Sequence, residues 1–345
     1  MKIKDDAFFK LIRNFLTIYL PKQKCYSLNT IKSYKEALNL LLDYLQTEKQ
    51  IPLLRITFEL LDSTTIGRFL DWLEEVRGCS VSTRNQRLMA LKSFFKYAAM
   101  MDSSQIAAHA ELAKVATKKA PSSIVEFLTE KALKILLEQP STHSRCGIRD
   151  RFFMILMYDT AARCQEMLDL RLKDIQLQPK NSIAYLTGKG GKMRVVPLMD
   201  KTVEHCRYYL DNFHPSGIGS ADDYLFYTTI HGKQNQMSPD NVASFMKRYG
   251  KLAKEGCSEV PENVHPHQLR HTRAIHLYRG GMPLALLSEF LGHADLATTQ
   301  IYAYADTEMK RAAIQKVDGM NQLTPREQPV WLDDDEMIRK LYGLK

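Results

Sequence analysis

Hydrophobic residues recur at helical spacing through the first hundred residues. They fall at every third or fourth position in four stretches, residues 8–19, 31–45, 69–76 and 88–98. Short polar residues that can cap a helix precede the last three stretches, in segments 27–30, 62–65 and 82–83. Four amphipathic helices of this length predict one small helical bundle.

Helices also dominate the pattern from residue 127 onward, with one strand signal. Thr129 precedes an apolar run and can cap a helix. Two apolar, β-prone runs, 183–187 and 193–198, flank the glycine-rich segment 188–192 and predict a hairpin. The fold class predicted is therefore mainly α with a small β-hairpin or sheet.

The composition between these regions predicts the domain boundaries. Lysine, proline and serine with few apolar residues mark an exposed linker at 114–126. It separates a helical domain at 1–113 from a mostly helical domain at 127–320. A helix is expected near 308–316, followed by a loosely tethered tail at 321–345. In that tail four apolar residues predict a short amphipathic helix: Leu332, Met337, Ile338 and Leu341.

The bulk composition is that of an ordinary soluble protein. The chain has 345 residues, 45% hydrophobic and 25% charged, which suits about two domains. Its longest apolar run, 152–158, is too short to span a bilayer, and acidic residues stand where a signal peptide would be cationic. We therefore expect a cytoplasmic protein without a membrane partner. Six scattered cysteines with no CxxC pair predict reduced thiols.

The net charge of +9 favours a polyanionic partner, and most of the excess lies in the first 120 residues. Five basic residues there occupy polar helical positions and are candidate DNA contacts: Lys32, Lys35, Arg84, Arg87 and Lys92. A solvated helix face explains such residues equally well, and the charge pattern leaves both interpretations open.

A first chemical candidate lies where an apolar helix meets a break of small residues. Residues 152–159 run into Thr160-Ala161-Ala162, and a new helix is expected to start at Arg163. An arginine at a helix start adds to the positive helix terminus and favours an anion. Glu166 shares a helical face with Arg163 and can hold it by charge. Taken alone, this pair could equally be a surface salt bridge.

A second candidate set combines histidines, an arginine and a tyrosine. His267, Arg270 and His271 share one face if their segment is helical. A metal site at His265, His267 and His271 is disfavoured, because Gln268 replaces the glutamate of an HExxH motif and Arg270 would repel a cation. Asp295 can cap a helix carrying Tyr302, nine residues after His293, with Tyr304 on another face.

Together these motifs resemble the tyrosine recombinases, the phage integrase family. In order along the chain they are RxxE at Arg163, GKG at 188–190, HxLRH at His267, and LGHxxxxTTxxY at 291–302. The resemblance covers all but about the last twenty residues. Segments 29–34 and 83–88 resemble the family's core-binding domain. One departure is Thr160-Ala161-Ala162, where the family often has Thr-Gly-Leu, so the shape of that turn stays open.

The resemblance implies a role for each matching residue. Arg163 and Arg270 would clamp the scissile phosphate, and Tyr302 would attack it to form a 3′-phosphotyrosyl link. The other implied roles are general acid for Lys189, proton transfer at the nucleophile for His267, a phosphate hydrogen bond for His293, support for Glu166, structural neighbour for His271, and phosphate contact or solvated turn lysine for Lys192.

The function implied is site-specific recombination or integration of double-stranded DNA without ATP, metal or other cofactor. The implied assembly is a dimer on each site and a tetramer in synapsis, with the tail docking on a neighbouring protomer and an accessory DNA-bending or directionality protein as a further candidate partner. A nucleoid-associated place in the cytoplasm follows. Mobile-element integration, plasmid resolution and chromosome-dimer resolution all fit. The alternatives are a type IB topoisomerase-like enzyme and a non-catalytic DNA-binding protein.

Overall fold

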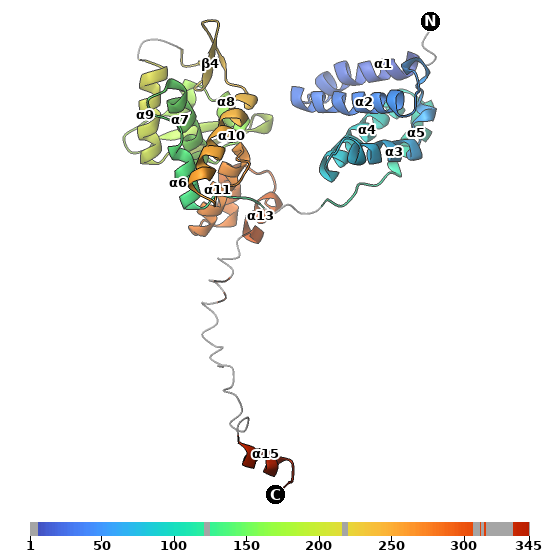
Figure 1. Cartoon of the computed structure of the whole chain (residues 1–345). Coiled ribbons are helices and arrows are strands. Elements are labelled where there is room, and N and C mark those ends of the chain that lie inside the picture. The colour runs from blue at the N-terminus through green and yellow to red at the C-terminus, as the bar shows by residue number, and fades with distance from the viewer. Residues whose placement is uncertain are drawn as a thin grey trace. The chain divides into compact units, whose positions relative to one another are not determined.

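The chain folds into two compact units, Met1–Ser123 and Ile124–Lys345, which are described separately (Figure 1). The structure is a computed structural model that describes residues 6–120, 125–215, 220–305, 311, 314 and 334–344. The side chain of Lys189 is also outside the description. Among the described helices, none is long and apolar enough to cross a membrane.

Unit 1 is helical throughout its described part. Its helices, including π- and 3-10 segments (η), are α1 Asp6–Asn14, η1 Phe15–Gln23, α2 Leu28–Thr47, η2 Leu53–Arg55, η3 Phe58–Leu60, α3 Ser63–Glu75, α4 Val81–Met101, η4 Ser103–Gln105 and α5 Ile106–Ala113. The predicted caps form at Ser27 and Asp62, whose side chains accept from the N–H groups of Thr30 and Thr65. Helix α4 begins earlier than predicted, with Ser80 as its cap. Helix α5 was not predicted.

The core of unit 1 is aromatic. Phe8, Phe15, Phe69 and Phe94 are fully buried, and Phe58 stacks on Phe94 with ring centroids 5.9 Å apart. Each such side chain contributes about 1.5–3 kcal/mol by leaving water. The apolar stripe of the sequence is thus the buried face of the bundle.

The first half of the predicted linker lies against unit 1. The side-chain amide of Asn85, on α4, makes two hydrogen bonds to the backbone of Lys118. Its Nδ2 donates to the carbonyl over 2.8 Å, and its Oδ1 accepts from the N–H over 3.1 Å. Arg84 donates to the carbonyl of Ala116 over 3.2 Å, and the Lys118 ammonium pairs with Glu74. Residues 116–118 are therefore fixed to α4.

Unit 2 is mostly helical with short strands. Its elements are α6 Glu130–Glu138, α7 Arg145–Thr160, α8 Cys164–Asp169, η5 Leu172–Asp174, β1 Ile175–Gln176, β2 Ile183–Thr187, η6 Lys189–Gly191, β3 Met193–Pro197, α9 Asp200–Phe213, β4 Tyr227–Ile230, β5 Lys233–Gln236, α10 Pro239–Gly256, α11 Pro266–Arg279, α12 Leu284–Leu291, α13 Ala297–Ala305 and α15 Asp335–Leu341. Helix α7 is central to the fold and packs against α9 and α11.

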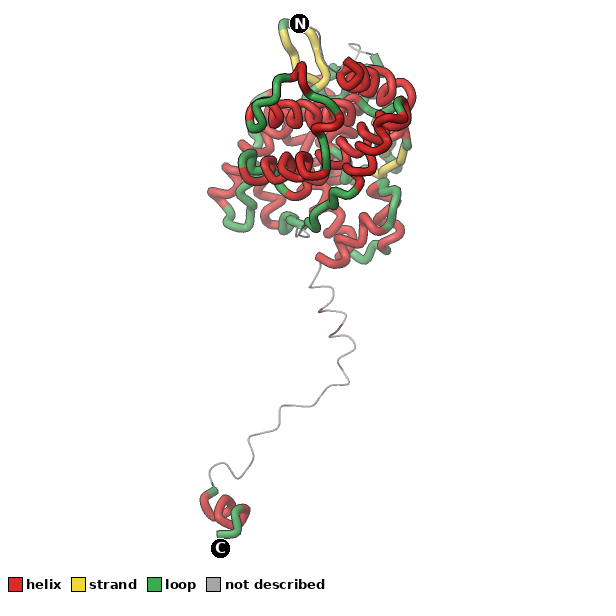
Figure 2. Tube along the Cα trace, turned by 90° about the vertical axis from the view of Figure 1, so that its right-hand side faces the viewer, coloured by secondary structure: helices red, strands yellow, loops and turns green. Residues whose placement is uncertain are grey.

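The predicted hairpin is present, and strand content is small (Figure 2). Strands β2 and β3 pair antiparallel from Ile183↔Pro197 to Thr187↔Met193, and β1 extends them to three strands. A second hairpin, β4–β5, was missed by the prediction of a single strand signal. Its second strand is wholly polar, so no alternation of apolar and polar residues marked it. The predicted fold class, mainly α with a small antiparallel sheet, is confirmed.

The tail contains the short helix α15, capped by Asp334, within the segment predicted to be amphipathic. Met337 and Leu341 are exposed on it. The predicted helix at 308–316 and the position of Leu332 lie almost wholly outside the described residues.

Candidate active site

Arg163 and Arg194 form one charge cluster around the buried carboxylate of Glu166. The guanidinium of Arg163, at the start of α8, donates from Nη1 to Oε1 of Glu166 over 2.7 Å, and its backbone N–H donates to Oε2 over 2.8 Å. Arg194, on β3, donates from Nη1 and Nη2 to the same oxygens over 3.0 and 2.8 Å. One carboxylate, 4% exposed, is therefore shared by two guanidinium groups.

Glu166 stays ionised despite its burial. Burial alone would raise the pKa of this carboxyl, but hydrogen bonds from Arg194 and Arg163, together with the charge of Arg194, lower it to about 2. The carboxylate can then hold both arginines in fixed orientations. Arg194 was missed from the sequence. Its available signal was a basic residue at an inward, alternating position of β3, two residues before buried Val196.

Arg270 of α11 is buried beside this cluster. It donates from Nη1 to the carbonyl of Ala161 over 2.6 Å and from Nη2 to that of Leu291 over 2.7 Å. Burial and then the charge of Arg163 lower the pKa of its guanidinium to about 10, so it remains charged at neutral pH. A guanidinium has more N–H donors than these two bonds use. Because its partners here are neutral carbonyls, Arg270 can offer charge and donors to an anion.

The turn that presents the Ala161 carbonyl has an unusual backbone. Ala161 follows the last residue of α7 and adopts the left-handed conformation, with φ 48° and ψ 32°. This region favours glycine, and a residue with a Cβ pays about 1–2 kcal/mol there. The departure from Thr-Gly-Leu therefore keeps a glycine-type turn, with an alanine strained into it.

Tyr302 of α13 lies in contact with His271 rather than at the surface. Its hydroxyl is 2.9 Å from Nδ1 of His271 and its side chain is 1% exposed. Burial raises the pKa of the phenol, while the charges of Arg270 and Arg163 act to lower it. The phenol, His271 and the two arginines thus share one region of unit 2.

His271 is the histidine at the phenol, although the sequence marked it only as a structural neighbour. Burial, followed by the charges of His267 and Arg270, lowers the pKa of His271 to about 4. At neutral pH its imidazole is therefore uncharged and can accept a proton. His267 lies one turn earlier on α11, exposed, with its ring centroid 6.2 Å from that of His271.

His293 lies between α12 and α13, within reach of the charges of the arginines. Its Nδ1 is 2.8 Å from the hydroxyl of Thr299. Burial, and then the charges of Arg270, Arg163 and Arg194, lower its pKa to about 4. The nearby carbonyl of Gly292 accepts from Nη2 of Arg163 over 3.3 Å. Gly292 therefore contacts Arg163 through its carbonyl, and His293 lies close enough to the arginines for their charges to lower its pKa.

Two glycines allow backbone to approach these arginines closely. A Cβ on Gly188 would lie 3.2 Å from Oε1 of Glu166 and 3.9 Å from Nη1 of Arg163. A Cβ on Gly292, which has φ 63°, would lie 3.1 Å from Nη1 of Arg194. The turn between β2 and β3 thus begins at the cluster, and Lys189 is the next residue along it. Lys192, at the other end of the turn, is exposed.

The described residues contain no group of three or more His, Cys, Asp or Glu side chains arranged to hold a metal ion. The set considered from the sequence was His265, His267 and His271. In the structure His271 instead contacts Tyr302, and the backbone N–H of His265 donates to Gln268.

The candidate DNA contacts of unit 1 divide into two kinds. Lys32 and Lys35 of α2 are exposed. Arg87 is buried, paired with Glu36 over 2.9 Å and donating to the carbonyl of Ser33. Arg84 is also buried, and Lys92 donates to the carbonyl of Ala113 over 3.3 Å. The prediction that Arg84 and Arg87 lie on an exposed face is therefore wrong, because they join helices and linker within the unit.

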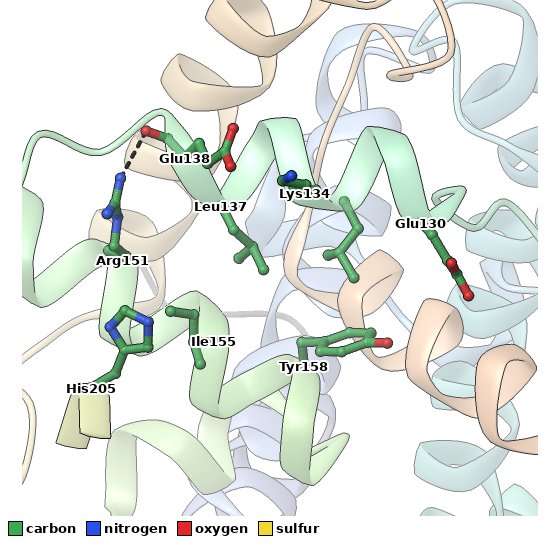
Figure 3. A pocket seen from close by; sticks show the side chains of 9 residues that line it. Glu130, Lys134, Leu137, Glu138, Arg151, Ile155, Tyr158 and His205 are labelled. Carbon is green, nitrogen blue, oxygen red and sulfur yellow. Dashed lines mark hydrogen bonds between the residues drawn. The ribbon is translucent and has the colours of Figure 1, made fainter. Parts of the chain in front are cut away.

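A separate groove of about 530 Å³ lies between α6, α7 and α9 (Figure 3). Its walls include Leu133, Leu137 and Ile155, with Lys134 and Arg151 among its polar residues. It shares no lining residue with the arginine cluster. The groove is thus distinct from the candidate active site.

Comparison with known proteins follows the same division of the chain. Residues 126–309 match the model of the phage integrase family, and residues 12–100 match that of the phage integrase N-terminal SAM-like domain. The chain is 30% identical over 342 residues to y4rC of Sinorhizobium fredii, a protein named as an integrase/recombinase, with 99% of each chain covered.

Two further likenesses cover most of the chain. It is 31% identical over 256 residues to the tyrosine recombinase XerA of Pyrococcus horikoshii, covering 74% of this chain and 81% of that protein. The fold resembles a crystal structure of the XerH site-specific recombinase bound to difH substrate in a pre-cleavage complex. That match has a TM-score of 0.63 and 22% identity, and covers 90% of this chain and 89% of the other.

Proposed function

The chain belongs to the phage integrase family of tyrosine recombinases, and from this premise we propose that it is a site-specific DNA recombinase acting through a 3′-phosphotyrosyl intermediate. The family resemblance read from the motifs is thereby confirmed. The observation that carries the mechanism is the contact of the Tyr302 hydroxyl with His271, beside two charged arginines.

Arg163 and Arg270 bind the scissile phosphate in this proposal. A phosphodiester repels nucleophiles by its charge, so cations on its non-bridging oxygens lower the barrier to attack. Both guanidinium groups are fixed by protein partners, Arg163 by Glu166 and Arg270 by two carbonyls. Donors held in place beforehand need little reorganisation during the reaction. His293, neutral at neutral pH, supplies a further hydrogen bond to the phosphate.

The phenol oxygen of Tyr302 attacks the phosphorus atom. A bond forms between that oxygen and phosphorus, which stays attached to the 3′ oxygen of the DNA, while the bond between phosphorus and the 5′ oxygen breaks. We assign the phenol proton to His271 because its Nδ1 lies 2.9 Å from the hydroxyl. Accepting there requires the ring proton on Nε2. His267, exposed one turn away, keeps only an assisting role in proton transfer.

Lys189 is our candidate for the acid that gives the 5′ oxygen its proton. Support comes from the turn itself, because Gly188 is packed against the Arg163–Glu166 pair. The reverse step, attack of a 5′ hydroxyl on the phosphotyrosine, rejoins the strand. Bond energy is conserved in both transesterifications, so this chemistry calls for neither ATP nor a metal.

Double-stranded DNA is the proposed substrate, bound by a dimer at each site and by a tetramer in synapsis. The recombinase XerH, whose fold this chain shares, is described as bound to its difH substrate. We place the enzyme with the nucleoid in the cytoplasm, with an accessory DNA-bending or directionality protein as a further partner. In unit 1, the exposed Lys32 and Lys35 are the proposed DNA contacts, and in unit 2 Lys192.

We further propose that the tail docks on a neighbouring protomer. Helix α15 supports this because Met337 and Leu341 are exposed on it rather than packed. Deleting the residues after Asn321 should leave DNA cleavage measurable and weaken synapsis in a gel-shift assay. Unchanged recombination by the truncated protein would contradict tail docking.

The test is a covalent adduct on DNA. Nicked suicide duplexes drawn from DNA flanking the gene are incubated with the full chain in EDTA, and protein–DNA adducts are separated on denaturing gels. Tyr302→Phe should form no adduct, because it lacks the attacking oxygen. Tyr304→Phe, a tyrosine two residues away, is the matched control and should form it like the wild type.

The possible outcomes distinguish the proposed function from its alternatives. An adduct that disappears only with Tyr302→Phe supports metal-free attack by this tyrosine. An adduct abolished by EDTA would overturn the metal-free mechanism. Tight binding without any adduct across a broad site library would favour a non-catalytic DNA-binding protein. Relaxation of supercoiled DNA by a monomer, without strand exchange, would favour a topoisomerase-like enzyme.

A further inference from the structure

A second buried ion pair adjoins the candidate active site and has no part in the chemistry above. Asp159, in the last turn of α7, is 4% exposed and accepts from Nη2 of Arg273 over 3.0 Å. Arg273 lies one turn after Arg270 on α11. Asp159 lies two residues before Ala161, whose carbonyl accepts from Arg270. The ion pair and the Arg270 hydrogen bond therefore join the same two helices in parallel.

The other oxygen of Asp159 reaches a third element. Oδ2 accepts from the backbone N–H of Met199 over 3.0 Å. Met199 lies two residues after the end of β3 and is the N-cap residue of α9, and β3 carries Arg194. The carboxylate of Asp159 thus links three elements. They are the end of α7, the helix α11 that carries Arg270, and the segment that follows β3, the strand that carries Arg194.

Arg273 is held in place by more than this pair. Its guanidinium lies over the ring of Tyr158, 5.1 Å from the centroid. The Tyr158 hydroxyl is 2.9 Å from Nδ1 of His276, on α11 itself. Figure 3 shows Tyr158 extending from α7 at one end of the groove. Stacking and hydrogen bonding together leave the guanidinium little freedom to rotate.

We propose that Asp159 and Arg273 are positioning residues that set the place of Arg270, and through β3 that of Arg194, for the scissile phosphate. This inference rests on the proposed function, since it concerns the phosphate-binding arginines of that same site. Arg273 does not itself bind the phosphate. Its effect passes through the alignment of α11 with the end of α7.

The experiment measures adduct formation and DNA affinity separately, on the full chain and one suicide duplex. Arg273→Ala removes the pair, and Asp159→Asn is a milder variant that keeps an acceptor for the Met199 amide. Displacing a catalytic group by about 1 Å can cost on the order of 100-fold. We expect single-turnover cleavage to fall about 10- to 100-fold, with the dissociation constant for DNA within about threefold of wild type.

Arg248→Ala is the matched control. Arg248, on α10, also pairs with a buried aspartate, Asp150, at 3.4 Å, and its side-chain hydrogen bonds among the described residues go to Asp150 and Tyr249, outside the candidate site. Its loss should leave the ratio of cleavage to binding unchanged. Arg273→Lys keeps the charge but not the planar contact with Tyr158, so it should recover part of the rate.

A methylphosphonate at the scissile position separates positioning from general damage. A methylphosphonate linkage is uncharged, because a methyl group replaces the anionic non-bridging oxygen that Arg270 would stabilise. The loss of cleavage rate in Arg273→Ala relative to wild type should therefore shrink to within about threefold. An equal defect on both duplexes, or cleavage of Arg273→Ala and Asp159→Asn matching that of Arg248→Ala, would overturn the inference. Wild-type cleavage in the same assay keeps this outcome distinct from failure of the proposed function.

Discussion

Replacing Glu166 by glutamine should destabilise unit 2 while sparing its shape. The substitution keeps the size of the side chain but removes the charge that two guanidinium groups share. Arg163, Arg194 and Arg270 would then lie close together without a carboxylate among them. Their mutual repulsion and the weaker, neutral hydrogen bonds both favour unfolding.

The pKa of Glu166 gives the size of the effect. A carboxyl with a pKa of about 2 in the folded protein, against 4.5 as its reference value, is stabilised in its charged form by about 3 kcal/mol. The side chain is 4% exposed, so solvent screening takes little from that figure. Because the folded pKa is the lower one, this stability is complete above about pH 4.5 and is lost as the pH falls toward 2.

The assay is urea unfolding at pH 7 followed by pulse proteolysis, with peptides of unit 2 identified by mass spectrometry. Glu166→Gln should lower the free energy of unfolding of unit 2 by about 3 kcal/mol. Glu259→Gln removes an exposed carboxylate that contacts Thr129 and Lys131, and should leave the free energy of unfolding nearly unchanged because solvent screens such contacts.

Inorganic phosphate gives an independent check on the same reasoning. If the three arginines form an anion site, added phosphate should stabilise Glu166→Gln more than wild type, because the anion replaces the lost carboxylate. A loss below about 1 kcal/mol, or equal phosphate stabilisation of both proteins, would refute the electrostatic account of this cluster.

Three further predictions concern His271, Ala161 and acid stability. His271→Gln should slow adduct formation by about 100-fold or more, the usual worth of a general base, and His267→Gln by much less; the reverse order would contradict the proton assignment. Ala161→Gly should raise the melting temperature of unit 2. Relief of about 1–2 kcal/mol of strain in the left-handed conformation exceeds the entropy cost of glycine, about 0.4–1 kcal/mol. A lower melting temperature would show that the turn is unstrained. Acid should destabilise unit 2 below about pH 6.5, because His271 and His293 have folded pKa values of about 4 and the unfolded chain therefore binds more protons. The slope should reach at most about 1.4 kcal/mol per pH unit for each histidine, and a flat unfolding free energy between pH 7 and 5 would exclude such shifts.

Local signals in the sequence account for most of the fold. Ser27 and Asp62 cap helices because a short polar side chain before an apolar stripe meets the free N–H groups of the first turn. The hairpin at 183–197 was visible because its apolar strands flank glycines. The hairpin β4–β5 gave no such signal, because polar side chains line its second strand and pairing alone defines it.

The predictions from charge needed contacts that a sequence does not contain. Arg87 looked like a surface residue by its spacing, yet Glu36 and the carbonyl of Ser33, both on α2, bury it. Arg194 looked like an ordinary strand residue, yet it pairs with Glu166, which lies 28 positions earlier. In both cases the partner comes from another element, so only tertiary packing decides whether the arginine faces solvent or a carboxylate.

The same charges explain how a buried phenol could become reactive only when substrate is present. Without DNA, burial and then the charges of His267 and Arg270 lower the pKa of His271 to about 4, which makes it a weak base, while burial raises the pKa of the Tyr302 phenol. A phosphate anion placed on Arg270 would offset its positive charge and, by Coulomb's law, raise the basicity of His271. In the proposed mechanism, binding of the scissile phosphate would therefore strengthen the base that takes the proton of the buried Tyr302 phenol. The charge of the substrate would thereby favour cleavage by the DNA-bound protein.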